Sequence, residues 1–597
     1  MTAGADAPSV RHGRAVILRT GRLVATQVAA VVVLIGALAG TGARAVAVAG
    51  AIVLLSLVWL RPRGRWAYAW LATAVRYASR RHTAPPGGAA ALLAFVAPDA
   101  HVETAGQPVD EFAVIADEHG MTAVLELGDP TGLLMEVLPR LPPLPSLLPA
   151  TDTELPPVRV QLVLTSAPAP AARAGTSPPV MSYRTLTEGR LPAYGRALLA
   201  VRVLRSEEWT DDDLRRALAG VVRRLPRRLG RLPARAFGTT TVAAAVGELA
   251  HDDGATPPRE GWANLRIGGL VQVGFRLDRL PDRRSEASRR LVARMLAVPA
   301  AATTVALTAG PGGAGATIHV RLAANNSAGL AVAAHALRLV VSAEHGCLRR
   351  LDGDQLDGLA ATLPLGGERR PDVPGRGARP GLSAEVLDGL DLPTGDGGLM
   401  LGRDRHGRPV VVRLFRPEET RALLVGGVRC AQLIALRAIA MGARVVVQTA
   451  RAGAWEPFVR GVAAPGESIR IVPSGRAVEV PSGTPLSPLL AVVDVGAAVR
   501  ADEQPAFGWQ ATLTVRDEVV SADADVASRA DLLVLQRLRE EEAGVLRDPL
   551  GLGDAADWFV KIRPDMVGVV NRKAVRWATL AQTPIERQLI GSASRSI

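Results

Sequence analysis

Residues 423–450 read LLVGGVRCAQLIALRAIAMGARVVVQTA: an apolar strand, two glycines, a helical stretch and a second strand rich in valine. A phosphate-binding loop has this lead-in, because glycines let backbone amides approach a phosphate at the start of a helix. Short apolar runs bounded by turn signals continue as far as ADLLVLQRL, as expected of buried parallel strands, and MVGVVNRKAVRWATL is expected to close the domain as a hairpin. The sequence therefore predicts a parallel α/β domain over 396–597, built like a nucleotide-binding fold.

The residues that would perform nucleotide chemistry are missing from this loop. A G-x-x-x-x-G-K-[ST] loop places its lysine on the β and γ phosphate oxygens and its hydroxyl on magnesium. Here only Val428, Arg429 and Cys430 follow the glycines before the helix resumes, and no lysine occurs before Lys561. The apolar run LLAVVDVG ends in Asp494, which is followed by valine rather than glutamate. We therefore expect a degenerate loop with no catalytic residue, no hydrolysis and no cofactor.

The composition restricts the other possibilities. The 597 residues carry a formal net charge of +13, supplied almost entirely by arginine. Because an arginine- and alanine-rich composition can follow from genomic base bias, the charge is no evidence for nucleic-acid binding, and no nucleic-acid partner is expected. Nine histidines make no HxxxH pair and the two cysteines, Cys347 and Cys430, make no CxxC pair, so no metal site is expected.

A basic segment over 215–235 leaves several interpretations open. It fits contact with anionic lipid, with an acidic partner or with DNA, or a solvated helix face. The helix that carries it is expected to begin at Thr210, capped with the help of Asp213, and to stop at Pro226.

Two uncharged runs predict a membrane anchor within residues 1–85. The runs, 23–40 and 45–60, would form helices roughly 24–27 Å long, the short end of what spans a bilayer core of ~30 Å. The four residues Thr41–Arg44 between them are expected to form a tight turn. A cleaved signal peptide is the alternative, and a second apolar run directly after the first argues against it.

Arginines indicate the orientation of this hairpin. They are frequent on both outer flanks, whereas Arg44 stands alone between the runs, so both termini are expected in the cytoplasm of a multi-pass protein of the inner (plasma) membrane. Gly36 and Gly40 form a GxxxG pair that would let a second helix pack closely. The aromatic residues expected at the membrane interface are Trp59, Trp66, Tyr68 and Trp70.

The cytosolic part is expected to be of the α+β class before the α/β domain begins. A β-rich hairpin segment is predicted over 86–137, followed by a proline-rich linker over 138–157. Two similar α+β modules are predicted over 158–250 and 268–366. A second linker, 367–395, leads to the α/β domain.

Two resemblances follow from these stretches. LGRDRHGRPVVVRLF before ALLVGGVRCAQLIALRA resembles the start of the motor domain of FtsK-type ATPases, and LLAVVDVG resembles their magnesium-binding strand. The hairpin with its exit WLRPRGRWAYAW, the stretch YRTLTEGRLPAYGRALLAVRVL and the ending FVKIRPDMVGVVNRKAVRWATLAQTPIERQLIG resemble the long actinobacterial form of EccE, a membrane component of type VII (ESX) secretion systems.

The resemblance to EccE implies a non-catalytic structural role in protein export. Its partners would be membrane lipid and the other membrane components EccB, EccC and EccD, and its task would be the assembly or stability of the inner-membrane complex. The alternative is a membrane-tethered regulatory protein that binds a nucleotide without hydrolysing it.

Overall fold

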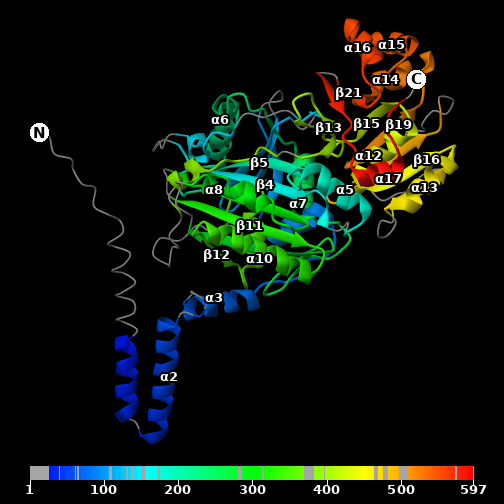
Figure 1. The fold of residues 1–597 in the computed structure, drawn as a ribbon. Coiled ribbons are helices and arrows are strands. Elements are labelled where there is room, and N and C mark those ends of the chain that lie inside the picture. The colour runs from blue at the N-terminus through cyan, green and yellow to red at the C-terminus, as the bar shows by residue number, and fades with distance from the viewer. Residues whose placement is uncertain are drawn as a thin grey trace, which may run out of the picture. The chain divides into compact units, whose positions relative to one another are not determined.

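The computed structural model describes residues 26–595, except 39, 61, 63–65, 107–110, 130–131, 136–139, 150–154, 173–174, 280–284, 312–314, 369–381, 383, 396, 463–467, 475–481, 497–507 and 572–573. The chain forms two compact units, Met1–His82 and Thr83–Ile597. The described part of the first unit is helical, and the second contains two large sheets (Figure 1).

Three helices follow one another in the described part of the first unit: Thr26–Leu38, α2 (Thr41–Trp59) and α3 (Ala67–Ala78). The expected turn at Thr41–Arg44 is wrong, because these residues form the first turn of α2. The chain reverses at Gly40 instead, whose φ of 104° is readily adopted by glycine. A shorter turn therefore joins the two apolar helices.

Only α2, among the described helices, is long and apolar enough to cross a bilayer. The helix Thr26–Leu38 is about 20 Å long at 1.5 Å per residue, short of a ~30 Å hydrocarbon core. The start of the first predicted run and the arginines before it lie outside the described residues. The structure thus supports one spanning helix and does not support a multi-pass protein.

The second unit opens with a 12-stranded sheet in which all neighbouring strands are antiparallel, in the order β1-β2-β3-β5-β4-β10-β11-β9-β8-β7, with β6 on β3 and β12 on β9. Its strands are β1 (His101–Ala105), β2 (Phe112–Asp117), β3 (Gly120–Leu127), β4 (Val158–Pro168), β5 (Pro192–Leu204), β6 (Ala234–Ala236), β7 (Arg259–Glu260), β8 (Leu265–Ile267), β9 (Leu270–Arg279), β10 (Ala302–Ala309), β11 (Ala316–Ala324) and β12 (Cys347–Arg350).

The two halves of this sheet repeat one topology. The order β2-β3-β5-β4 corresponds to β8-β9-β11-β10, and β6 lies on β3 as β12 lies on β9. The halves meet where β4 pairs with β10. Residues of β2 and β3 are buried on both faces, so this hairpin is an inner part of the first half rather than a separate segment.

Helices cover both faces of the sheet. One face packs against α6, α9 and α10, and the other against α4, α7 and α11. The helices of this part are α4 (Gly88–Val96), α5 (Pro178–Thr187), α6 (Asp211–Leu229), α7 (Thr239–Ala250), α8 (Glu286–Arg289), α9 (Leu291–Leu296), α10 (Ser327–Ala343) and α11 (Gln355–Ala361), with the 3-10 helices η2 (Leu144–Leu147) and η5 (Ala384–Gly389). Leu144 of η2 and Leu387 of η5 belong to the core, so both predicted linkers contribute to packing where they are described.

The structure confirms the predicted start of α6 and corrects its end. Thr210 and Asp213 form a reciprocal capping box, as expected from the sequence. The helix nevertheless continues through Pro226 to Leu229. Leu225 and Leu229 are buried against the sheet, and this packing outweighs the backbone hydrogen bond that the proline cannot donate.

The C-terminal sheet has ten strands in the order β14-β13-β22-β21-β20-β15-β19-β18-β16-β17. The strands from β20 to β17 are parallel, as predicted, whereas the four from β21 to β14 extend the sheet in antiparallel fashion. They are β13 (Leu399–Arg403), β14 (Pro409–Val412), β15 (Thr420–Val425), β16 (Arg444–Thr449), β17 (Ile469–Pro473), β18 (Leu489–Asp494), β19 (Gln510–Arg516), β20 (Leu532–Leu535), β21 (Met566–Asn571) and β22 (Ala574–Thr579).

Helices also cover both faces of the second sheet. Residues of α12, α13 and α17 pack on one face, together with α5 from the preceding part of the chain, and α14, α15 and α16 pack on the other. The bounds are α12 (Val428–Ala440), α13 (Ala452–Val462), α14 (Ala524–Arg529), α15 (Glu540–Arg547), α16 (Ala556–Lys561) and α17 (Pro584–Ile590), with η6 (Ser521–Asp523) and η7 (Gly553–Ala555). Because α5 packs here, a helix from the first part of the chain contributes to the core of the second sheet, and both sheets belong to one compact unit.

Candidate functional site

The carboxyl ends of the parallel strands define the candidate site. In parallel α/β sheets ligands bind at this edge, outside the ends of strands on either side of a change in strand order. The residues that end or follow these strands are Gly426 (β15), Thr449 (β16), Asp494 (β18), Arg516 (β19) and Gln536 (β20). The predicted phosphate loop and the predicted magnesium-binding aspartate therefore lie on one edge.

The glycine loop is filled by a side chain from the neighbouring strand. The amide of Gly427 donates to Oε1 of Gln536 at 3.0 Å, and a Cβ atom at Gly426 would collide with the same oxygen. Gln536 is completely buried, and its Nε2 donates to the carbonyl of Ala593 at 2.6 Å. A loop amide that a phosphate would need is thus committed to an internal hydrogen bond.

The C-terminal segment, residues 591–595, packs along this edge. Gln582 binds it twice, because its Oε1 accepts from the amide of Ala593 at 3.0 Å and its Nε2 donates to the carbonyl of Gly591 at 3.0 Å. Arg595 then makes a two-pronged ion pair with Glu542, at 2.6 and 3.0 Å. Burial alone would raise the pKa of Glu542, and the bonds from Arg595 hold it below its usual value.

Asp494 is saturated by protein groups. Arg451 donates to both of its oxygens, at 2.6 Å to Oδ1 and 2.9 Å to Oδ2. Trp455 Nε1 and the hydroxyl of Thr449 donate to Oδ2 at 2.8 and 3.1 Å. Arg451 also pairs with Asp517. Burial favours the neutral carboxyl, yet the bonds from Arg451 and Trp455 lower the pKa of Asp494. The guanidinium of Arg451 therefore engages the carboxylate oxygens of Asp494 that a magnesium ion would need as ligands.

Two further residues, Cys430 and Lys561, do not take the roles that a phosphate loop gives to its hydroxyl and its lysine. Cys430, at the start of α12, is buried, and burial raises the pKa of its thiol to about 12, so it carries no thiolate at neutral pH. Lys561 lies on α16, on the helical layer that also contains α14 and α15. Cys430 and Lys561 therefore do not supply the hydroxyl and the lysine of a phosphate loop.

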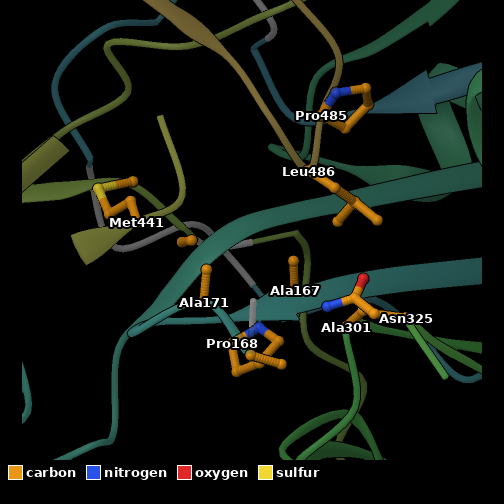
Figure 2. A pocket seen from close by; sticks show the side chains of 10 residues that line it. Ala167, Pro168, Ala171, Ala301, Asn325, Met441, Pro485 and Leu486 are labelled. Carbon is orange, nitrogen blue, oxygen red and sulfur yellow. The ribbon is translucent and has the colours of Figure 1, made fainter. Parts of the chain in front are cut away.

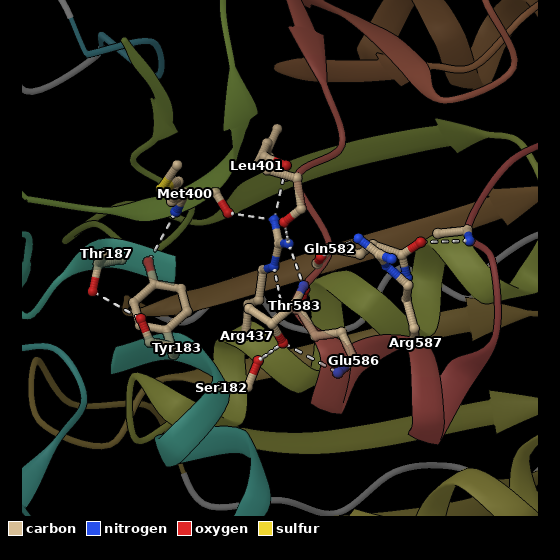
Figure 3. Close-up of polar contacts among 12 residues, drawn as sticks. Ser182, Tyr183, Thr187, Met400, Leu401, Arg437, Gln582, Thr583, Glu586 and Arg587 are labelled. Carbon is tan, nitrogen blue, oxygen red and sulfur yellow. Dashed lines mark hydrogen bonds and ion pairs between the residues drawn. The ribbon is translucent and has the colours of Figure 1, made fainter. Parts of the chain in front are cut away.

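A buried network fixes the helix that follows the glycine loop (Figure 3). Arg437 of α12 makes two bonds to Glu586 of α17, at 2.8 and 2.9 Å, and donates to the carbonyl oxygens of Met400 and Leu401 in β13. The amide of Met400 donates to the hydroxyl of Tyr183 on α5 at 2.9 Å, and burial raises the pKa of that tyrosine to about 12. Because every donor is matched, the network holds α5, α12 and α17 together without leaving an unpaired charge.

Two pockets in the described part of the second unit are unlike a substrate site. A cavity of about 20 Å³, lined by residues such as Pro168, Asn325 and Met441, holds roughly one water molecule (Figure 2). A larger groove of about 320 Å³ lies between α4, β1 and α7 and is lined mainly by alanine and valine side chains. Neither brings together polar groups that could activate a substrate.

The predicted packing glycines have different surroundings. A Cβ at Gly36 would collide with the Cβ of Ala47, so this glycine allows the helix Thr26–Leu38 and α2 to approach each other. Gly40 has open space around it and lies in the turn, beyond the helix end. The two glycines therefore do not share one helix face.

The predicted interface aromatics lie at the end of α2 and the start of α3. Trp59 and Tyr68 are exposed, whereas Trp66 and Trp70 are half-buried. Trp70 Nε1 donates to the carbonyl of Pro62 at 3.2 Å. Two of the four side chains are thus exposed and two are partly covered.

Sequence reasoning located the loop and Asp494 but missed the groups that occupy them. Gln536 stands directly after the strand LLVL, and Arg451 stands two residues after the strand that neighbours β18. Both are polar residues at the carboxyl end of a strand, and this position was the available signal.

Comparisons with known proteins give little guidance. No family model and no curated protein match the chain. Over 28% of its length it is similar to all of the genome packaging NTPase B204 from Sulfolobus turreted icosahedral virus 2 in complex with AMPPCP, with 9% identity and a TM-score of 0.20. Over 33% of its length it is similar to 31% of the cytoplasmic domain of the Thermomonospora curvata type VII secretion ATPase EccC, with 11% identity and a TM-score of 0.23. Scores this low carry no conclusion about this chain.

Proposed function

We propose that this protein is a non-catalytic structural component of an inner-membrane type VII secretion complex, of the EccE kind, and that it supports assembly or stability of the export machinery. The non-catalytic part rests on one observation, that the carboxyl edge of the parallel strands is closed by the protein's own side chains. Gln536 accepts the hydrogen bond of a glycine-loop amide, and Arg451 forms an ion pair with Asp494. We call this arrangement the closed edge. A nucleotide-binding-like fold whose site is filled by its own side chains suits a structural role rather than ligand binding.

The membrane part of the proposal rests on α2. Its 19 residues would extend about 28 Å, and large apolar side chains such as Val46 and Ile52 are exposed along it. Exposed apolar surface of this extent is unfavourable in water and favourable in lipid. The arginines after the helix, Arg76, Arg80 and Arg81, favour a cytoplasmic position for the body of the protein.

The partners follow from the sequence resemblance: EccB, EccC and EccD, with the motor supplied by EccC. Extraction in mild detergent from cells that express the neighbouring membrane components tests this. We expect the full chain to elute in a large complex with those components. A strictly monomeric particle, obtained when the other components are present at normal levels, would contradict the structural role.

The alternative of a nucleotide-binding regulator is tested separately. For a nucleotide to bind at the glycine loop, Gln536 would have to move away from the loop and from residues 591–595. This movement would break the buried hydrogen bonds of Gln536 with Gly427 and Ala593. Saturable binding of an ATP analogue by the full chain would favour that alternative over the closed edge.

A further inference from the structure

The short helix α3 carries an exposed apolar stripe. Tyr68, Leu71 and Val75 are 44%, 51% and 60% exposed, and Ala72 between them is exposed as well. Their spacing, i, i+3, i+4 and i+7, places all four on one side of the helix. A stripe with this spacing normally faces a protein core, but here it remains uncovered.

The opposite side of α3 is packed. Thr73 is completely buried, and Trp70 and Tyr77 are half-buried. The bond from Trp70 to the carbonyl of Pro62 joins the start of α3 to the segment that leaves α2. The helix therefore has one covered side and one exposed side, and the apolar stripe is the exposed one.

The position of α3 in the chain points to what covers the stripe. α2, the one described helix able to span a bilayer, ends at the exposed Trp59, and α3 begins at Ala67. The two helices contact each other, and α3 starts beside the end of α2 and leads sideways from it (Figure 1). At 12 residues α3 is about 18 Å long, too short to cross a bilayer itself.

We propose that α3 lies in the headgroup layer of the bilayer that α2 spans, with Tyr68, Leu71, Ala72 and Val75 turned toward the acyl chains. The occupant of the stripe is thus a lipid surface. An amphipathic helix in this position buries its apolar side at the boundary of headgroups and chains. The exposed Arg76 beside the stripe would then lie at the level of the lipid phosphates, while its guanidinium donates to the hydroxyl of Thr73 at 3.2 Å. This inference rests on the proposed membrane anchoring by α2.

Spin labels placed on the full chain in lipid nanodiscs test the proposal. Three single-site proteins are compared: Leu71→Cys and Ile52→Cys, each with Cys347→Ser, and the unchanged chain labelled at its exposed Cys347. The buried Cys430, with its pKa raised to about 12, stays unlabelled in the folded protein. Collision rates with oxygen, which enters lipid, and with a water-soluble nickel chelate report the depth of each label.

The compared quantity is the ratio of the oxygen collision rate to the nickel-chelate collision rate. We expect this ratio to be several-fold higher at position 71 than at Cys347, and lower at position 71 than at position 52. Adding Val75→Asp to the Leu71→Cys protein should move its ratio toward that of Cys347, since a charge on the stripe opposes burial in lipid. Both substituted positions are exposed, so the fold is retained. A label at 71 that matches Cys347 while the label at 52 is deep overturns this inference and leaves the anchoring intact. Aqueous ratios at both 52 and 71 overturn the anchoring itself.

Discussion

Removing the guanidinium of Arg451 should make the carboxyl edge of the parallel strands open more often. The substitution is Arg451→Ala, which leaves the carboxylate of Asp494 with the bonds from Trp455 and Thr449 but without a counter-charge. The Asp494 side chain is only 3% exposed, so it stays desolvated after the change. A buried charge without its partner is costly, and the native edge should open more often.

The magnitude follows from the exposure of the two partners. Breaking a fully buried ion pair by removing one partner costs about 3–5 kcal/mol. The Arg451 side chain is 38% exposed, so solvent screens part of the interaction, and we expect about 2 kcal/mol. This corresponds to a roughly 30-fold change in the opening equilibrium. A matched control is Arg529→Ala, which breaks the exposed i,i+4 pair with Asp525 and should cost at most about 0.5 kcal/mol.

Hydrogen exchange of the peptide that covers β18 measures this opening. Exchange in Arg451→Ala should be roughly 30-fold faster than in the unchanged chain, and Arg529→Ala should leave it unaltered. Adding Asp494→Asn to Arg451→Ala should recover part of the loss, because no unpaired charge then remains. Equal exchange in Arg451→Ala and Arg529→Ala would refute the view that this ion pair closes the edge.

Two further predictions concern other parts of the chain. Burial, with Arg321 nearby, lowers the pKa of His251 from 6.5 to about 3. Between these two pH values the unfolded chain binds a proton at this histidine and the native chain does not. The free energy of unfolding should therefore fall as the pH drops from 6.5 toward 3. His251→Asn, which tolerates the positive φ at this position, should flatten that dependence, as measured by denaturant midpoints at pH 7 and pH 5, and an unchanged slope would contradict it. Gly36→Leu should broaden the distance distribution between one spin label on the helix Thr26–Leu38 and one on α2, because its side chain meets Ala47. Gly50→Leu, which has open space, serves as the control, and equal distributions in the two variants would show that Gly36 does not hold the helices together.

Local patterns in the sequence predicted the elements that depend on neighbouring residues. Apolar runs located α2 and the parallel strands, and the spacing of Thr210 and Asp213 located the start of α6. These features are decided within one or two turns of chain. The end of α6 was missed because it depends on the packing of Leu229 against a sheet whose strands lie far away in the sequence.

The same limit applies to the candidate site. The glycine loop was recognised as degenerate from its own residues, but its filling depends on Gln536, more than a hundred residues away. The partner of Asp494 could not be predicted either, since Arg451 approaches it only because β16 and β18 are neighbours in the sheet. Pairings between distant segments are set by topology, which a single sequence does not reveal.

Nucleotide binding by the full-length protein tests the closed edge most directly. The chain, in detergent or nanodiscs, is titrated with a fluorescent ATP analogue and magnesium up to millimolar concentration, with a hydrolysing P-loop ATPase as the positive control. Because Gln536 and Arg451 hold the positions that a phosphate and a magnesium ion would need, we expect no saturable signal from this protein. Saturable one-to-one binding that unlabelled ATP displaces would contradict the account.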